Sequence, residues 1–520
     1  MHKKHKLSLF LAIVIFLFII STLTIRQNLP SLVPLKKNNE FRNLNLSKIE
    51  YSNVSVISDG YAGIYWNDGN SDLPNIAVDD SGGIHVVWSD DTNGEWGIDG
   101  EIMFTHYSET TGWSNATVIS DGYNGTYWND GDSGWPSIAV DNLGGVHVVW
   151  IDDTNGEWGV DSEIMFTHYT EATGWSNATV ISDGYNGTYW TDGYCGFPDI
   201  AVDDSGVIHV VWSDETKGAW TGGMWETDIM YVNYTEATGW SNLTVISDGY
   251  NGTYWNDGAS VLPKIATDGA GGVHVVWIDD TDGVWGNDYE IMYANFTEAT
   301  GWSNVTVISD GYNNTYWNDG RSIDPDITVD DSGGIHVVWE DDTDGVWGTD
   351  IEIMYVNYQK ADGWSNPTVI SDGCNGIYWN HGESSYPDIA VDDSGGIHVV
   401  WHDNTVGLWG GGGLEYEIIF VNNLKANGWS NPTVISDGYN GIYWNDDLSA
   451  IPKIAVDNSR GIYVVWYDYT DGAWGTDAEI MFTSISISGT QLEVIPSGNF
   501  SLIIMIISVL GLIIYLKRKL

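Results

Sequence analysis

Repeated tryptophans in turn-rich segments offer the clearest chemistry in this sequence. The segment YNGTYWNDG and its counterparts place Tyr, Asn and Asp beside each Trp. An indole can stack on a sugar ring while amide and carboxylate groups bind the hydroxyls. The segments therefore predict ligand-binding residues at Trp66, Trp128, Trp190, Trp255, Trp317, Trp379 and Trp444.

A second repeated loop, DDTDGVWG in its commonest form, is rich in carboxylates. Ca²⁺ takes six to eight oxygen ligands, so these loops suit calcium, although they lack the EF-hand pattern. Asp, Asn and Gly also shape turns through bonds to the backbone, so a structural role for the acids and the Trp stays open. The candidate calcium ligands are Asp279, Asp280, Asp341 and Asp342.

These loops belong to a unit of about 62 residues that occurs seven times between Tyr51 and Ser484. In the second copy four runs rich in Val, Ile, Tyr and Phe predict strands, at 137–141, 145–152, 163–169 and 177–182. A Trp ends the second run, and its alternation with Val predicts a place in the core. Four short strands cannot bury both faces alone, so the units must stack. A histidine on the same strand favours a buried, hydrogen-bonded imidazole over a metal ligand.

The phase of the repeats predicts a closed ring. The array starts with a lone fourth strand at 53–58 and ends with a third strand at 479–485. Strands at the two ends complete one blade only if the ends join. Propellers have four to eight four-stranded blades, so the sequence predicts an all-β, seven-bladed propeller whose N-terminal strand closes the last blade.

The units PDIAVDDSGGIHVVW and EIMYVNYQKADGWSNPTVIS resemble blades of sialidase-like propellers with BNR or Asp-box repeats. The resemblance covers about 435 residues, although the Asp-box at 361–365 is degenerate. Sialidases hold the substrate carboxylate with three arginines, and the ring contains only Arg321 and Arg460. The resemblance therefore implies the fold and not sialidase activity.

Catalytic residues are not evident in the sequence. No Ser-His-Asp, Cys-His or HExxH arrangement appears, and carboxylates are too numerous to single out an acid/base couple. An active site in a ring should be single, so its residues should break the repeat. The residues that do so form no plausible catalytic set, and we expect a protein that is not an enzyme. The departures are Tyr194-Cys195, Gly222–Trp225, His381, Gly410–Leu414 and Tyr463.

The two ends of the chain are apolar and basic. Residues 1–28 predict a signal peptide or an uncleaved anchor, followed by a linker at 29–50. After the propeller at 51–487, a linker at 488–499 leads to a predicted transmembrane helix at 500–516 and a basic cytoplasmic tail at 517–520. The tail is similar to the anchors of archaeal surface proteins. We therefore expect an extracellular propeller at the cell membrane.

Sequons in the ring agree with an extracellular glycoprotein, although repetition copies one chance sequon many times. They lie at Asn53, Asn115, Asn124, Asn177, Asn186, Asn233, Asn242, Asn251, Asn295, Asn304 and Asn313.

Charge limits the partners of the ring. Residues 51–487 hold seven of the 18 Lys and Arg and 69 of the 72 Asp and Glu, a formal net charge of −62. Repulsion excludes nucleic acid and anionic lipid. The sequence predicts an anchored binding or surface-layer module for glycan or cell-surface protein. A glycoside hydrolase with a site in the central channel and a spacer without ligand are the alternatives.

Overall fold

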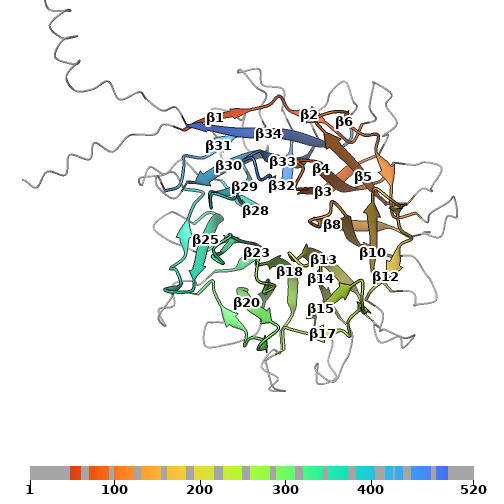
Figure 1. The fold of residues 1–520 in the computed structure, drawn as a ribbon. Coiled ribbons are helices and arrows are strands. Elements are labelled where there is room, and N and C mark those ends of the chain that lie inside the picture. The colour runs from red at the N-terminus through yellow and green to blue at the C-terminus, as the bar shows by residue number, and fades with distance from the viewer. Residues whose placement is uncertain are drawn as a thin grey trace, which may run out of the picture. The chain divides into compact units, whose positions relative to one another are not determined.

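The computed structural model describes residues 47–59, 69–92, 99–121, 131–153, 161–182, 193–215, 227–248, 258–280, 288–310, 320–343, 349–372, 382–404, 416–424, 428–436, 447–469 and 476–489. From Ile49 to Ser488 they form one compact unit of seven antiparallel sheets arranged as the blades of a ring (Figure 1). The expected all-β, seven-bladed propeller is confirmed. Every described element is a strand, and within these ranges no helix has the length and apolar character to span a bilayer. The terminal segments expected to anchor the chain lie outside the described residues.

The innermost strand of each blade begins earlier than the sequence predicts. In blade 2 we expected a start at Ser137, yet β8 starts at Ser133 and includes Trp135 and Pro136. Its register against the next strand shifts between Gly134 and Ser137, where Pro136 has no N–H to donate to the ladder. All seven innermost strands share this bulge: β3 (Ser71–Val78), β8 (Ser133–Val140), β13 (Cys195–Val202), β18 (Ser260–Thr267), β23 (Ser322–Val329), β28 (Ser384–Val391) and β32 (Ser449–Val456).

The two middle strands of each blade match the expected runs. The second strands are buried along nearly their whole length: β4 (Ile84–Asp90), β9 (Val146–Asp152), β14 (Ile208–Asp214), β19 (Val273–Asp279), β24 (Ile335–Asp341), β29 (Ile397–Asp403) and β33 (Ile462–Asp468). The third strands pair with them: β5 (Glu101–Ser108), β10 (Glu163–Thr170), β15 (Asp228–Thr235), β20 (Glu290–Thr297), β25 (Glu352–Gln359), β30 (Glu417–Asn423) and β34 (Glu479–Gly489).

The outer edge consists of short segments where one fourth strand was expected. In blade 2 both pieces pair with β10, and Gly174 at φ 73° makes the turn into the first of them. The pieces are β6 (Gly112–Trp113), β7 (Thr117–Val118), β11 (Gly174–Trp175), β12 (Thr179–Val180), β16 (Gly239–Trp240), β17 (Thr244–Val245), β21 (Gly301–Trp302), β22 (Thr306–Val307), β26 (Gly363–Trp364), β27 (Thr368–Val369) and β31 (Thr433–Val434).

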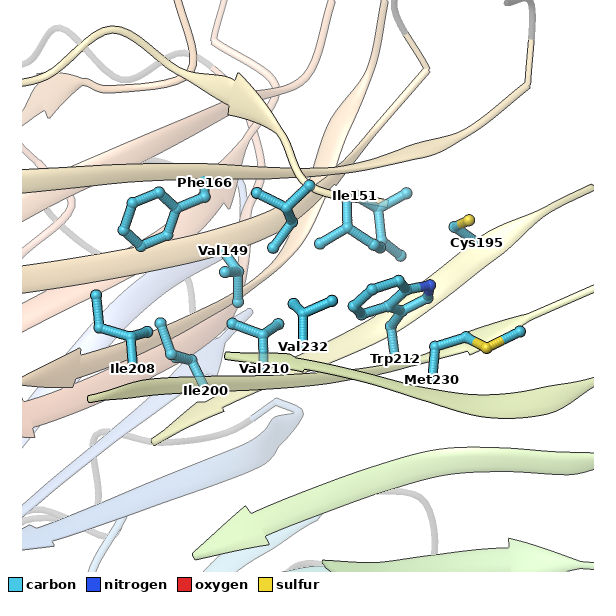
Figure 2. Packing of buried hydrophobic residues seen from close by; sticks show 12 residues of the cluster. Val149, Ile151, Phe166, Cys195, Ile200, Ile208, Val210, Trp212, Met230 and Val232 are labelled. Carbon is cyan, nitrogen blue, oxygen red and sulfur yellow. The ribbon is translucent and has the colours of Figure 1, made fainter. Parts of the chain in front are cut away.

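The core lies between neighbouring blades. Figure 2 shows Val149 and Phe166 of blade 2 above Val210 and Trp212 of blade 3. Trp212 is fully buried, and burying a large apolar side chain contributes about 1.5–3 kcal/mol. The prediction that the strand-end Trp forms inter-blade core is confirmed at all seven positions, Trp88, Trp150, Trp212, Trp277, Trp339, Trp401 and Trp466.

Polar residues that recur from blade to blade form hydrogen bonds beside this core. The indole N–H of Trp150 donates to Asp152 at 3.2 Å, and the same carboxylate accepts from Ser133 at 2.9 Å. His147 Nε2 lies 3.0 Å from Asp141 Oδ2. Burial lowers the pKa of His147 although Asp141 opposes it, so the imidazole is neutral at physiological pH. The expected buried, hydrogen-bonded imidazole is confirmed.

The N-terminal strands close the ring as the repeat phase predicts. Both β1 (Ser47–Tyr51) and β2 (Ser55–Val56) pair with β34 in the last blade. Ile57 N donates to Ile480 O at 2.9 Å, and Ser484 N donates to Ser52 Oγ at 2.9 Å. The last blade therefore contains both ends of the ring.

Candidate functional site

Seven residues with positive φ, which we call the channel ring, line the centre of the propeller. Each precedes the proline of an innermost strand and has φ between 47° and 54°. This region is rare for bulky residues and costs on the order of 1–3 kcal/mol, so the surrounding structure must impose it. With their prolines they line a cavity of about 90 Å³. The channel ring is Leu73, Trp135, Phe197, Leu262, Asp324, Tyr386 and Ile451.

A second set of residues, which we call the support ring, lies beside the channel ring. Each follows the buried Trp of a second strand, as Glu340 does, and Glu340 pairs in register with Ile323. Glu340 Oε2 accepts from Tyr386 N of the next blade at 3.2 Å, and His402 Nδ1 accepts from Ile451 N at 3.3 Å. The support ring therefore joins blades at the channel. It is Ser89, Ile151, Ser213, Ile278, Glu340, His402 and Tyr467.

The two rings break the repeat, and their reactive members gather at blades 5 and 6. Asp324 and Glu340 come from blade 5, and Tyr386 and His402 from blade 6. The His402 ring lies 5.2 Å from that of Tyr386 and 4.8 Å from that of Tyr416, centroid to centroid. Most other ring positions carry aliphatic residues or serine. Blades 5 and 6 thus carry a polar cluster at channel positions where most blades have aliphatic residues or serine.

Burial sets the protonation of this cluster. It raises the pKa of Asp324, against the attraction of Lys453 and Lys264. It also raises the pKa of Glu340, and the charge of Asp324 adds to that effect. Burial lowers the pKa of His402 to about 3, so its imidazole is neutral. At neutral pH the carboxyl pair therefore retains a proton, as a general acid requires.

A further carboxylate breaks the repeat at the same end of the channel. Asp72 immediately precedes Leu73 of blade 1, where the other blades have Gly, Val, Ile, Ser or Ala. Burial, with Asp91 and Asp90 nearby, raises its pKa to about 6. Asp72 is thus mostly ionised at neutral pH, while the carboxyl pair of blade 5 holds a proton. Two carboxyls in different protonation states are what acid/base catalysis needs.

The described cations near the channel are paired. Lys453 Nζ donates to Asp388 at 2.7 Å, and Lys264 Nζ lies 3.6 Å from Asp199. Arg321 Nε donates to Asp342 at 2.9 Å. These ion pairs leave little positive charge to hold an anionic sugar.

The candidate calcium ligands have structural partners. Asp279 accepts from Ser260 and Trp277, and Asp341 accepts in the same way within its own blade. Asp280 accepts from the backbone of Ala259, and Asp342 binds Arg321. Within the described ranges no three carboxylate, imidazole or thiol side chains converge as a metal site.

The predicted sugar-binding tryptophans, from Trp66 to Trp444, lie outside the described residues. The residues that flank these loops are described, and in blade 1 Asp91 N donates to Asn70 O at 2.9 Å. The two loops that carry Trp therefore leave blade 1 at adjacent points. They do so at the end of the strands that holds Asp72 and the support ring.

The polar residues that break the repeat at the channel are not among the departures that the sequence suggested. Of the departures that the sequence suggested, Tyr463 only replaces a histidine, since its hydroxyl donates to Asp457 at 2.7 Å. His381 and both insertions lie outside the described residues. Aligning the seven copies at the residue before each proline would have revealed the channel ring. The proline that follows interrupts the strand pattern, so the sequence alone predicts that the strand begins after it.

Comparisons with known proteins show a fold and no family. Neither a family model nor a curated protein sequence matches the chain. A polysaccharide lyase, an ulvan lyase of family PL25 bound to -[GlcA(1-4)Rha3S]-, superposes with a TM-score of 0.50 at 12% identity, over 80% of this chain and 94% of that one. The α-L-arabinanase of Penicillium chrysogenum (TM-score 0.40, 12% identity, 84% and 98% covered) and the NanB sialidase of Streptococcus pneumoniae (0.39, 11%, 84% and 71%) are more distant.

These neighbours correct the expectation that this protein is not an enzyme. An ulvan lyase has the same fold, so the absence of the three sialidase arginines does not exclude catalysis by other residues. At such low identity the likeness itself shows the shared seven-bladed fold.

Proposed function

We propose that this protein is a glycoside hydrolase that acts on a neutral polysaccharide at the mouth of the propeller channel. The observation that carries the proposal is the polar cluster of Asp324, Glu340, Tyr386 and His402, at channel positions where most blades carry aliphatic residues or serine. Repetition alone would have placed the same residues in every blade. The glycan-acting neighbours of the same fold are consistent with a glycan substrate.

Hydrolysis needs two carboxyls with different tasks. The carboxyl pair of Asp324 and Glu340 holds one proton, because the pKa of Glu340 is raised to about 8. Asp324, which lines the cavity, passes this proton to the glycosidic oxygen as the C–O bond breaks. Ionised Asp72 takes a proton from the water that attacks the anomeric carbon. Glu340 positions Tyr386 through the backbone bond and shares the proton of Asp324.

Hydrolysis fits these residues better than elimination. A lyase removes a proton beside a sugar carboxylate, and that step needs positive charge to neutralise the carboxylate. Lys264, Lys453 and Arg321 are already paired with aspartates. The surrounding ring is strongly acidic, which also disfavours a uronic acid.

The repeat supplies a test that preserves the fold. Asp324→Leu installs the residue that blades 1 and 4 carry at the same place, as Leu73 and Leu262. We expect the variant to melt like the wild type and to lose about 10²–10⁴-fold in kcat on neutral polysaccharides, measured by release of reducing ends. The matched control, Ile451→Leu, should retain activity. A fully active Asp324→Leu would refute the proposed site, and unsaturated products would instead indicate a lyase.

The location of the enzyme is a separate proposal that rests on sequence. The basic, apolar ends and the sequons support an extracellular propeller anchored at the cell membrane. Protease added to intact cells should digest the propeller. Protection of the propeller until the cells are lysed would contradict this location.

A further inference from the structure

The side of the channel opposite the polar cluster carries two aromatic residues. Trp135 and Phe197 are the channel-ring residues of blades 2 and 3. Their rings meet edge to face, with centroids 5.0 Å apart and planes at 76°. In the closed ring β8 of blade 2 lies across the centre from β28 of blade 6 (Figure 1). The aromatic pair thus lines the same cavity as Asp324 and Tyr386 of the polar cluster, from the opposite side.

Trp135 has little structural reason to be a tryptophan. It is 39% exposed, whereas each strand-end Trp is fully buried. It has a φ of 52°, and blades 1 and 4 place Leu in this same conformation. A leucine would therefore satisfy the fold, and the indole adds mainly a flat apolar surface that faces the cavity.

The size of the cavity decides how a glycan can lie. The cavity has a volume of about 90 Å³. Pockets that enclose ligands have about 300–1,000 Å³. A sugar polymer therefore lies across the mouth of the channel, with one residue over the polar cluster and a neighbouring residue over the aromatic pair.

We infer that Trp135 and Phe197 form a stacking subsite for a neutral sugar residue of the polysaccharide, beside the one whose bond is cleaved. The inference rests on the proposed function, and it assigns substrate binding to the side of the channel that carries Trp135 and Phe197. The edge-to-face contact with Phe197 fixes the indole plane, so that its free face is available to the C–H face of the sugar. Stacking needs no charge, which agrees with the paired cations around it.

Trp135→Leu tests this subsite, because Leu73 and Leu262 show that leucine fits the position. In the active protein we expect KM on a neutral oligosaccharide to rise at least tenfold, about 1.4 kcal/mol, with kcat changed less than threefold. Trp135→Tyr should keep most of the affinity, and the melting temperature should be unchanged. An unchanged KM in a folded Trp135→Leu protein would overturn the subsite.

Binding of the neutral oligosaccharide to Asp324→Asn, measured by calorimetry, separates this inference from the proposed function, because binding needs no turnover. If oligosaccharide binds and Trp135→Leu in that background weakens binding tenfold, the subsite stands even where no wild-type cleavage is found. If binding persists at full strength without the indole, the subsite is wrong whatever the activity. If Trp135→Leu lowers the melting temperature, the binding of oligosaccharide to Trp135→Tyr becomes the deciding measurement. Complete loss of binding by Trp135→Tyr would count against stacking.

Discussion

Replacing one buried glutamate should change how stability depends on pH. Glu290 begins the third strand of blade 4, is fully buried, and accepts a hydrogen bond from Ser309 through Oε2. Its Oε1 has no hydrogen-bond partner among the described residues. Burial raises the pKa of Glu290 to about 9, and Asp310, Asp288 and Asp341 add to the shift against the bond from Ser309.

The sign follows from proton binding. Between the ordinary pKa near 4.5 and the raised value, the native state holds a proton that the unfolded chain releases. Stability from this group is therefore complete at low pH and falls as pH rises, by about 1.4 kcal/mol per unit. From pH 6 to pH 8 the wild type should lose about 2.7 kcal/mol through Glu290. Glu290→Gln is always neutral and escapes this loss.

The assay is unfolding of wild type and Glu290→Gln by denaturant at pH 6 and pH 8, with EDTA present. The stability of the variant relative to wild type should rise by about 2–3 kcal/mol between the two pH values. A difference that is independent of pH would refute the reasoning, because it would mean that Glu290 is ionised in the folded ring. If the pH dependence disappears only when calcium is added, a bound cation neutralises the cluster instead.

Four further outcomes are expected. The value of kcat/KM should fall below about pH 6, where Asp72 takes up a proton, and Asp72→Asn should be inactive at every pH. A fall at a different pH would mean that another group is the general base. Deleting residues 47–56 should expose the edge of β34 and lower the melting temperature, and an unchanged melting curve would show that these strands do not hold the ring closed. Millimolar CaCl₂ should raise the melting temperature more than NaCl of equal ionic strength, and equal effects would mean screening alone. Joint replacement of Trp128, Trp190 and Trp255 by Ala should weaken binding to a polyvalent neutral glycan while the fold is kept; an unfolded variant would make these Trp structural.

Features that every blade repeats were predictable from sequence. Alternation around Trp150 placed it in the core, and the histidine beside it was expected to be buried and hydrogen-bonded. The lone strand at the start of the array predicted closure onto β34. The first two inferences used patterns that six or seven copies share, and the third used the phase of the repeats at the two ends of the array.

The candidate site was missed because it lies where the copies differ. Proline after Asp324 and Tyr386 interrupts the strand pattern, and a bulge with positive φ has no periodic signature. The contact between Glu340 and the next blade depends on how adjacent sheets pack. No local sequence pattern encodes that packing.

Closure by the first strands has a consequence for biosynthesis. Ser484 N binds Ser52 Oγ across 432 positions of sequence, whereas Ser71 and Asp90 of one blade are 19 apart. By loop-closure entropy the longer span costs only about 3 kcal/mol more. Time is the greater burden, since at roughly 5–20 residues per second the ribosome needs about 20–90 s to supply the partner of β2. During that interval β1 and β2 have been synthesised but have no partner strand, and the last blade is the last to form.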